Sequence, residues 1–593
     1  TWLRDYYCAV IKINTQQFNW KTKELSELTK TMLNIQITDT HPFEKSYQPK
    51  GDFDKELKKV ILNYDQAQDF RAKKKFNPTN DSSGTWIDYT KEYIKLAIPY
   101  DGLFRINYDD LVNYGLTPSF INPKTFKIFK KGKELPLFVL GENDASFDST
   151  DYIEFWCEKN YGMQNYRQTI STGVDYLNYM DRYIDTTFIW LTWDGIEGKR
   201  INQKQENIYQ PSDTISASLV KLHLENDVRL WYYDAVEPRV QIPNWQENKV
   251  WTWLTIGSSG SQSVSFSAKN IVPNTTLKTY IRLISNAADI QTSAHKNGVS
   301  INSTSILDSI AYDFKKTVTL NSEFSSNVLK EGNNTIRVFG MPTQASFHQS
   351  LIDWIDIDYF SYNTAINDSL MIRIPDTVTS GLKTIKITNI SSSSENLVLY
   401  KLTSSVEKIE NYILLGTSQK TLTFSDSVNS SDKYLLVTTS SLKKPEFRTK
   451  KRFLNLRNSA DGADYIIISN KVLFTSVNSY KNFIGSNYGV RTELAFVDDI
   501  YDEFSYGFPK AEAIKDFLFY ASNNWTAPKP SYLTLIGDAN YDYKDIYTPA
   551  PAIRKKNLVP SFGNPVSDSW FTMWDTLNIN IPQMYVGRIP ATT

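Results

Sequence analysis

The first 450 residues alternate short apolar runs with polar turns. In residues 263–268, for example, Val264, Phe266 and Ala268 alternate with serines, and stretches of Ser, Asn, Asp and Gly separate such runs. A period of two is typical of strands that bury one face. The pattern predicts antiparallel β-domains over this part of the chain, with weak helical periodicity and no strict internal repeat.

Turns and polar stretches divide this β-rich part into units. A polar stretch at residues 73–84 (KKKFNPTNDSSG) is typical of a linker and ends a short N-terminal segment. The expected units are an N-terminal β-rich segment with its linker (1–84), a β-domain (85–182), a jelly-roll-like β-sandwich (183–362) and a small β-domain (363–450).

The pattern changes after residue 450. Strands that are apolar on both faces alternate with helix-compatible stretches, which predicts a parallel sheet covered by helices on both sides. The expected strands are 465–469, 492–497, 532–536 and 584–586, and the expected helices are 472–483 and 511–520. We therefore expect an α/β domain over residues 451–593, with only the first part of its sheet present.

Size and composition restrict the class of protein. A chain of 593 residues has room for about four domains. Lys plus Arg and Asp plus Glu both total 65, so the formal net charge is zero and nucleic acid is not an expected partner. The longest apolar runs fall far short of the roughly 20 residues that span a bilayer. The sequence starts at Thr1 without a targeting peptide, so we expect any such peptide to have been removed or to lie outside it.

Cysteine and histidine are scarce. Cys8 and Cys157 are the only cysteines, and both lie in strand-like runs where buried free thiols are expected. The four histidines are His41, His223, His295 and His348, all upstream of the α/β domain. A cysteine or serine nucleophile needs a base within hydrogen-bond distance. Residues 451–593 therefore hold no Cys–His or Ser–His site of their own, and a site formed by Cys157 with His223 or His295 is disfavoured.

The loop after the third strand of the α/β domain is the main candidate for chemistry, because ligands of open α/β sheets bind outside the carboxyl ends of the strands. An EF-hand is rejected, since Tyr543 and Pro549 stand where that loop needs Gly and Glu. The carboxylates could still bind calcium or form a cationic subsite; alternatively they belong to a solvated turn. The candidate rim residues are Asp538, Asn540, Asp542, Asp545, Ser567 and Asp568, with Asp575 nearby in sequence.

A second candidate lies in the expected jelly roll. Trp354 stands between Asp353 and Asp356, and tryptophan rings stack on sugars, so this run is compatible with a carbohydrate-binding face. The alternation of residues 351–356 fits an ordinary sandwich strand equally well. Both interpretations stay open at this point.

Five runs in the α/β part occur in an order that resembles the gingipain-like cysteine peptidases. They are residues 463–469 (ADYIIIS), 497–507 (VDDIYDEFSYG), 513–518 (AIKDFL), 535–542 (LIGDANYD) and 586–591 (VGRIPA). Upstream, residues 98–106, 151–155 and 198–201 are similar to the β-domains of the sortase branch of this family, which serves the type IX secretion system.

The resemblance implies a caspase-like peptidase on the outer-membrane surface, exported with its signal peptide removed. Such an enzyme removes C-terminal signal domains from secreted cargo and attaches the cargo to lipopolysaccharide, together with a PorV-like outer-membrane β-barrel. No cofactor is required, although calcium is possible.

The family's catalytic His and Cys lie downstream of the Gly-Arg-Ile-Pro element, which is residues 587–590 here, and neither has a counterpart in this sequence. A truncated peptidase is favoured over a pseudoenzyme, because half a parallel sheet leaves an open edge. The other functions that stay open are a non-catalytic scaffold of a secretion apparatus and a surface binding protein.

Overall fold

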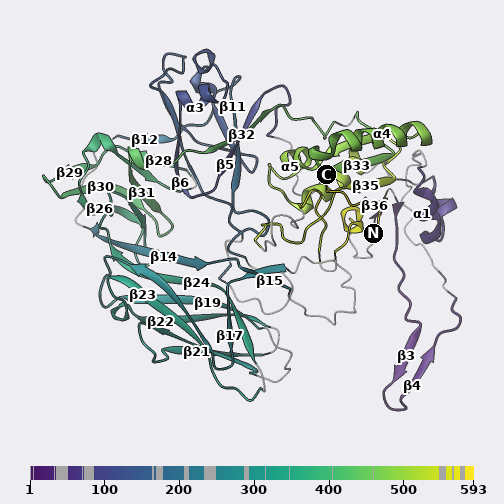
Figure 1. Cartoon of the computed structure of the whole chain (residues 1–593), viewed down its shortest axis with the longest axis horizontal. Coiled ribbons are helices and arrows are strands. Elements are labelled where there is room, and N and C mark those ends of the chain that lie inside the picture. Colours follow the sequence, from purple (N-terminus) through teal and green to yellow (C-terminus); the bar gives the residue numbers. More distant parts are fainter. Residues whose placement is uncertain are drawn as a thin grey trace.

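A computed structural model describes most of the chain (Figure 1). The described residues are 2–4, 6–32, 34, 51–69, 71, 86–162, 166–167, 178–205, 213–232, 249–285, 293–313, 316–345, 348–403, 405–458, 460–546, 556–563, 566–574 and 581–592. Strands dominate three domains, and the long helices lie in the C-terminal α/β domain. None of the described helices is long and apolar enough to cross a membrane.

The first β-domain consists of two sheets around an apolar core. One sheet has the order β32-β5-β11-β7-β8 and the other β6-β10-β9. Alternate residues of both sheets, such as Ile94 and Leu96 of β5 and Phe155 of β10, meet in one buried cluster. The strands are β5 (Tyr93–Ile98), β6 (Gly102–Asn107), β7 (Lys127–Lys130), β8 (Lys133–Leu135), β9 (Phe138–Leu140), β10 (Tyr152–Cys157), β11 (Thr187–Thr192) and β32 (Glu446–Lys451), with helix α3 (Tyr108–Asn113).

The small β-domain packs the sheet β12-β28-β27-β31-β25 against β13-β26-β30-β29. Its first two strands come from a segment far upstream of the others, and each pairs in parallel with a strand more than 150 residues later. The strands are β12 (Asn202–Lys204), β13 (Thr214–Ile215), β25 (Leu370–Arg373), β26 (Gly381–Ile390), β27 (Leu397–Lys401), β28 (Glu407–Ile409), β29 (Ile413–Leu415), β30 (Lys420–Val428) and β31 (Lys433–Thr438).

The jelly-roll-like sandwich contains β24 (Gln349–Tyr362), the longest strand among the described residues, inside one sheet with the order β14-β24-β19-β22. The opposing sheet has the order β18-β23-β20-β21, and β15 pairs with β16 beside it. The other strands are β14 (Ala217–Glu225), β15 (Arg229–Tyr232), β16 (Lys249–Thr252), β17 (Leu254–Gly257), β18 (Ser261–Ala268), β19 (Thr276–Ser285), β20 (His295–Ile301), β21 (Asp308–Tyr312), β22 (Thr317–Ser325) and β23 (Gly332–Gly340).

These three domains are nested, and the expected linear boundaries differ from the structure in this respect. The sandwich (217–362) stands between β13 and β25 of the small β-domain, which itself stands between β11 and β32 of the first β-domain. The boundaries expected at 182, 362 and 450 therefore place four strands in a different domain from the one that contains them in the structure. These strands are β11, β12, β13 and β32. Pairing between distant segments leaves no local sequence signal, so turn signals alone do not reveal the insertions.

The α/β domain confirms the expected alternation. Its sheet is fully parallel in the order β34-β33-β35-β36. Ile466 and Ile468 face α5 and α6, whereas Ile467 faces α4, so helices cover both faces. The elements are β33 (Tyr465–Ser469), α4 (Phe474–Tyr488), β34 (Thr492–Phe496), α5 (Val497–Phe504), α6 (Ala511–Asn524), β35 (Tyr532–Ile536) and β36 (Tyr585–Ile589). Helix α5 is the element that the sequence pattern missed.

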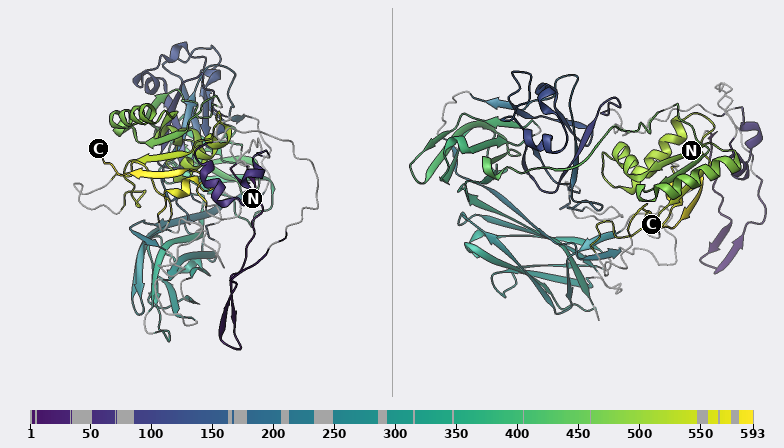
Figure 2. Two further views of the ribbon diagram at one scale, coloured as in Figure 1. Left: turned by 90° about the vertical axis from the view of Figure 1, so that its right-hand side faces the viewer. Right: turned by 45° about the horizontal axis from the view of Figure 1, so that its top comes forward.

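The N-terminal segment attaches to the α/β domain instead of the neighbouring β-domain. Strands β1 (Trp2–Leu3) and β2 (Tyr6–Tyr7) pack with helices α1 (Asp54–Val60) and α2 (Tyr64–Ala67) against Ile581 and Tyr585. Between them, β3 (Gln16–Asn19) and β4 (Glu24–Glu27) form a hairpin that stands clear of the domains (Figure 2).

Candidate functional site

The carboxyl end of β35 leads directly into the loop that the sequence singles out. Gly537 opens this loop with a φ of 141°, and an added Cβ would lie 3.0 Å from the Cβ of Leu558. A glycine is therefore required where the strand turns beneath the segment around residue 558. The backbone N–H of Asp538 donates to the carbonyl of Ala591 (2.9 Å), and the Asp538 carbonyl accepts from Leu558 (2.9 Å). These bonds bring three segments together at the end of the sheet.

Arg588 of β36 binds the segments that meet at this end of the sheet. Its guanidinium donates to both carboxylate oxygens of Asp568 (2.7 Å each) and to the carbonyl of Gly537 (2.7 Å). Two further bonds reach the carbonyls of Val559 (2.8 Å) and Pro560 (3.0 Å), so all five N–H donors are used. The arginine of the Gly-Arg-Ile-Pro element is thus a structural anchor, and Asp568 is its counter-ion.

The other expected rim residues stabilise turns. Asn540 Oδ1 accepts from the N–H of Asp542 (3.1 Å), and Asp542 Oδ1 accepts from Ile546 (3.1 Å). Ser567 Oγ accepts from the N–H of Trp570 (3.2 Å), while Asp545 is exposed with a φ of 61°.

The structure thus brings Asp538, Ser567 and Asp568 to one edge, joined through Gly537 and Arg588. A role for this rim in binding stays a prediction, and Asp575 lies outside the described residues. Within the described part of the chain, no group of three or more His, Cys, Asp or Glu side chains is placed to hold a metal ion.

A pocket of about 460 Å³ lies beside this loop, where three domains meet. Lys544 from the loop forms ion pairs with Asp185, next to the first β-domain, and with Asp227, next to the sandwich, at 2.8 Å each. Burial opposes the charge of Lys544, but the two carboxylates raise its pKa above the usual value. Sequence reasoning missed this contact because its members are more than 300 residues apart.

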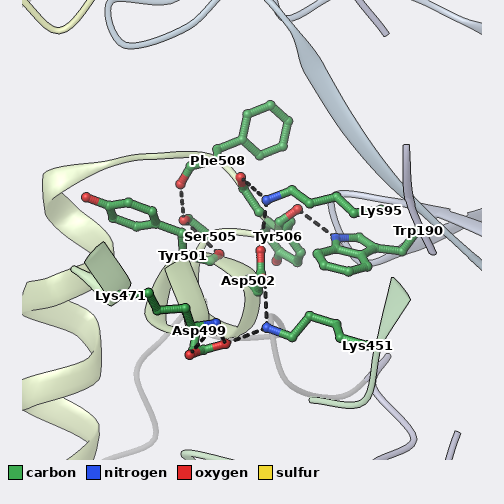
Figure 3. A network of polar contacts seen from close by, with 11 residues as sticks. Lys95, Trp190, Lys451, Lys471, Asp499, Tyr501, Asp502, Ser505, Tyr506 and Phe508 are labelled. Carbon is green, nitrogen blue, oxygen red and sulfur yellow. Dashed lines mark hydrogen bonds and ion pairs between the residues drawn. The ribbon is translucent and has the colours of Figure 1, made fainter. Parts of the chain in front are cut away.

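Helix α5 is held by lysines of the first β-domain (Figure 3). Lys451 of β32 contacts Asp499 (2.6 Å) and Asp502 (2.7 Å), and Lys95 of β5 contacts Asp502 (2.8 Å). Just beyond the helix, the carbonyl of Tyr506 accepts from the indole N–H of Trp190 on β11 (2.9 Å). The acidic residues of the run VDDIYDEFSYG therefore dock the α/β domain on the sheet β32-β5-β11.

The same helix buries one carboxyl group that has no basic hydrogen-bond partner. Glu503 is 1% exposed. Its Oε2 accepts from the N–H of Leu456 (2.9 Å) and the hydroxyl of Tyr89 (3.3 Å), and its buried Oε1 has no hydrogen-bond partner. Burial raises the pKa of Glu503 from 4.5 to about 7. A raised pKa can mark a functional acid, but this one lies inside a domain junction.

A buried polar network covers the outer face of β24. His223 contacts Asp356 through Nδ1 (2.5 Å) and Glu225 through Nε2 (2.8 Å). Burial lowers the pKa of His223, but the hydrogen bonds to both carboxylates outweigh this and raise it. Because both ring nitrogens are occupied, this histidine is not placed to act as a base for a cysteine.

Trp354 lies within this network and is fully buried. The ring of Tyr166 packs edge-on against it, and the guanidinium of Arg282 lies 5.2 Å from its centre. It sits in a β-bulge, where Asp353 and Trp354 together face Arg282 of β19. A sugar ring cannot stack on this tryptophan in the folded protein.

Cys157 is 1% exposed, and burial raises the pKa of its thiol to about 11. Cys8 is half-buried, and burial raises its thiol pKa as well. Neither cysteine forms a disulfide, and of the two only Cys157 is buried as the sequence predicts. Neither has the lowered pKa of a nucleophilic cysteine.

The run-by-run resemblance of the α/β domain is confirmed by comparison with protein families. Residues 458–593 match the model of Peptidase family C25. No curated protein sequence is significantly similar to the chain. The gingipain-like character of the α/β domain is thereby supported independently of its upstream β-domains.

Among solved structures, the chain is similar to dimeric latent PorU from Porphyromonas gingivalis, with a TM-score of 0.61 and 15% sequence identity. The match covers 86% of this chain and 49% of the PorU chain, so this chain spans about half of that protein. Together with the C25 match, this likeness confirms the expected fold class, which is β-rich domains followed by part of a gingipain-like domain.

Two carbohydrate-binding modules also match part of the chain. They are the CBM36-1 domain of a xylanase from the hindgut metagenome of Trinervitermes trinervoides (12% identity, 24% of this chain and 95% of that one, TM-score 0.15) and a family 35 module from Clostridium thermocellum (17%, 23% and 90%, TM-score 0.14).

Proposed function

We propose that this chain is the N-terminal part of a gingipain-like cysteine peptidase of the PorU type. The observation that carries the proposal is the coincidence of a C25 match over residues 458–593 with a PorU-like fold over most of the chain. The catalytic Cys and His then belong to sequence downstream of β36, since neither thiol here is a suitable nucleophile and no histidine follows His348.

In this proposal the enzyme is a sortase of the type IX secretion system on the outer-membrane surface. The downstream thiolate attacks the carbonyl that joins cargo to its C-terminal signal domain, and the histidine gives a proton to the departing amine. Water or an amine of lipopolysaccharide then releases the cargo from the acyl-enzyme. The expected partners are a PorV-like outer-membrane β-barrel and the secreted cargo, and calcium is a candidate ligand.

The β-domains act as a rigid support in this account. They hold α5 through Lys95 and Lys451 and the strand-end loop through Asp185 and Asp227. The contacts with α5 and with the strand-end loop together hold the carboxyl ends of the parallel strands in place. Ligands of such sheets bind at these strand ends, so their position must stay fixed during catalysis.

The rival function is a non-catalytic scaffold of the secretion apparatus. It is favoured by one observation, namely that the α/β residues of this sequence include neither Cys nor His. It predicts a protein that binds its partners without any thiol-dependent turnover.

The first experiment is the intact mass of the protein from its native source, with peptide mapping past residue 593. We expect a mass well above 68.2 kDa and a downstream Cys and His. The purified protein should then cleave cargo carrying its C-terminal signal domain, and alkylation of thiols should abolish cleavage.

The matched control is the double variant Cys8→Ser, Cys157→Ala, which removes both thiols of this chain. We expect it to cleave cargo at the wild-type rate and to stay sensitive to alkylation. A protein that lacks downstream Cys and His, or that cleaves nothing, would be the scaffold instead.

A further inference from the structure

The N-terminal segment leaves an apolar arm uncovered. All residues from 9 to 32 are exposed, and the hairpin β3–β4 within them pairs Phe18 with Leu25 across its strands. Trp20, at the turn, packs edge-on against Phe18 with ring centres 4.8 Å apart and is 76% exposed. An isolated two-stranded hairpin is at best marginally stable in water. The apolar face of Phe18, Trp20 and Leu25 therefore needs a surface to cover it.

The base of this arm is fixed to one particular place, the outer edge of the α/β sheet. Arg4 donates two hydrogen bonds to Gln583, through its backbone N–H to Oε1 (3.0 Å) and through its side chain to the carbonyl (2.6 Å). The hydroxyl of Tyr585 on β36 donates to Glu56 of α1 (3.0 Å), and its ring packs on Phe53. The arm and α1 thus start beside β36.

That edge of the sheet is open. Within the described residues, β36 pairs with β35 on one side and with no strand on the other. A Cβ added at Gly587 would meet nothing within 4 Å, and Ile589 is exposed. An apolar groove of about 330 Å³ runs between α1 and this strand, lined among others by Phe53, Leu57, Val60, Ile581 and Val586.

We propose that the arm and α1 form a clamp around the polypeptide that continues the sheet beyond β36. This rests on the proposed function, in which the rest of the peptidase domain follows this sequence. Three features select that occupant: the groove borders the unpaired strand, the arm starts from the same edge, and the chain spans only 49% of the PorU chain. In Figure 1, β33, β35 and β36 follow one another downward, and the arm reaches down on the same side.

The clamp is tested in the full-length protein with a photo-crosslinking residue in place of Trp20. An equal mixture of isotopically labelled and unlabelled copies separates crosslinks within one chain from crosslinks between copies. We expect the crosslinked peptide to lie downstream of residue 593 in the same chain. We also expect amide hydrogen exchange of residues 16–28 to be at least about tenfold slower than in an unstructured peptide.

Crosslinks between copies would overturn the proposal in favour of a dimer contact, and crosslinks to the barrel partner in favour of a docking arm. Rapid exchange with no crosslink would also overturn it. If the native protein ends at residue 593, both this inference and the proposed function are wrong. If the protein is an active peptidase but its arm crosslinks elsewhere, only the clamp is wrong.

A variant series gives a second readout. The triple change Phe18→Ser, Trp20→Ser, Leu25→Ser should lower the melting temperature of the full-length protein, because it removes the covered apolar face. The control is Phe120→Ser with Ile196→Ser, two apolar residues on the first β-domain that are 88% and 78% exposed, more than any of the three arm residues. Equal melting temperatures for the triple variant and the control would contradict the clamp.

Discussion

Replacing Glu503 by glutamine should change the way in which stability depends on pH. Glu503 is buried between α5 and residues 456–457, and burial raises its pKa from 4.5 to about 7. Below pH 4.5 the carboxyl is protonated in the folded and unfolded states alike, so it costs nothing. As the pH rises from 4.5 to 7, the unfolded chain loses this proton while the folded protein keeps it, so stability falls.

The size of the effect follows from the shift. Each pKa unit is worth about 1.4 kcal/mol, so ionisation of Glu503 costs the folded state about 3 kcal/mol once the pH is well above 7. Between pH 5 and pH 8 the change is about 2–3 kcal/mol. The side chain of the Glu503→Gln variant cannot ionise and does not carry this cost. The variant should therefore gain about 2–3 kcal/mol relative to wild type between these two pH values.

The assay is urea or thermal unfolding of both proteins at pH 5 and pH 8. The glutamine amide also changes the free energy of unfolding through packing, including at the buried place that Oε1 occupies in the wild type. This contribution is the same at both pH values, so it cancels when the two pH values are compared. In thermal unfolding, the melting temperature of the variant minus that of the wild type should increase by roughly 5–10 °C from pH 5 to pH 8, for a unit the size of the α/β domain.

The control is Glu446→Gln, which changes an exposed glutamate at the start of β32. We expect its stability relative to wild type to stay constant across the same pH range. If Glu503→Gln also stays constant, Glu503 is ionised in the folded protein and the junction is more hydrated than its burial indicates.

Two further predictions concern the anchor and the buried tryptophan. Arg588→Lys should destabilise the α/β domain by roughly 3–5 kcal/mol in denaturant unfolding, because a lysine cannot replace five donors to Asp568 and three carbonyls; a loss below about 1 kcal/mol would contradict the anchoring role. Trp354→Ala should destabilise the sandwich by about 3–5 kcal/mol in denaturant unfolding, because the ring is fully buried; a loss below about 1 kcal/mol would show that the ring contributes little to the packing of this domain.

The sequence predicts the α/β strands well because they are apolar on both faces. Residues 465–469 and 532–536 coincide with β33 and β35. Helix α5 escapes the same reasoning, since Asp499, Asp502 and Glu503 are acidic yet buried. Of the lysines that pair with the two aspartates, Lys95 lies on a strand about 400 residues upstream, in a unit that the sequence separates from the α/β domain, and Lys451 lies at the expected boundary itself. Burial of charge depends on such distant pairs, which periodicity does not reveal.

The sequence predicts where the candidate loop lies better than it predicts the contacts that hold the loop in place. The loop at residues 537–545 does lie at the end of the sheet, as the rule for parallel strands requires. The sequence does not single out Arg588, because nothing local distinguishes an arginine that anchors three segments from one in solvent. Its contacts with Gly537 and Asp568 come from loops 51 and 20 residues earlier.

The nesting of the β-domains sets an order in which the molecule can be completed during synthesis. Sheet β32-β5-β11 stays without one of its edge strands until residues 446–451 emerge, by which time the sandwich and then the small β-domain already have all their strands. The first strand of the α/β domain, β33, starts at residue 465, after β32 has ended at residue 451. The last strand of the support is therefore synthesised before β33, α4 and β34, which precede the docking helix, so the sheet β32-β5-β11 has all its strands when α5 leaves the ribosome.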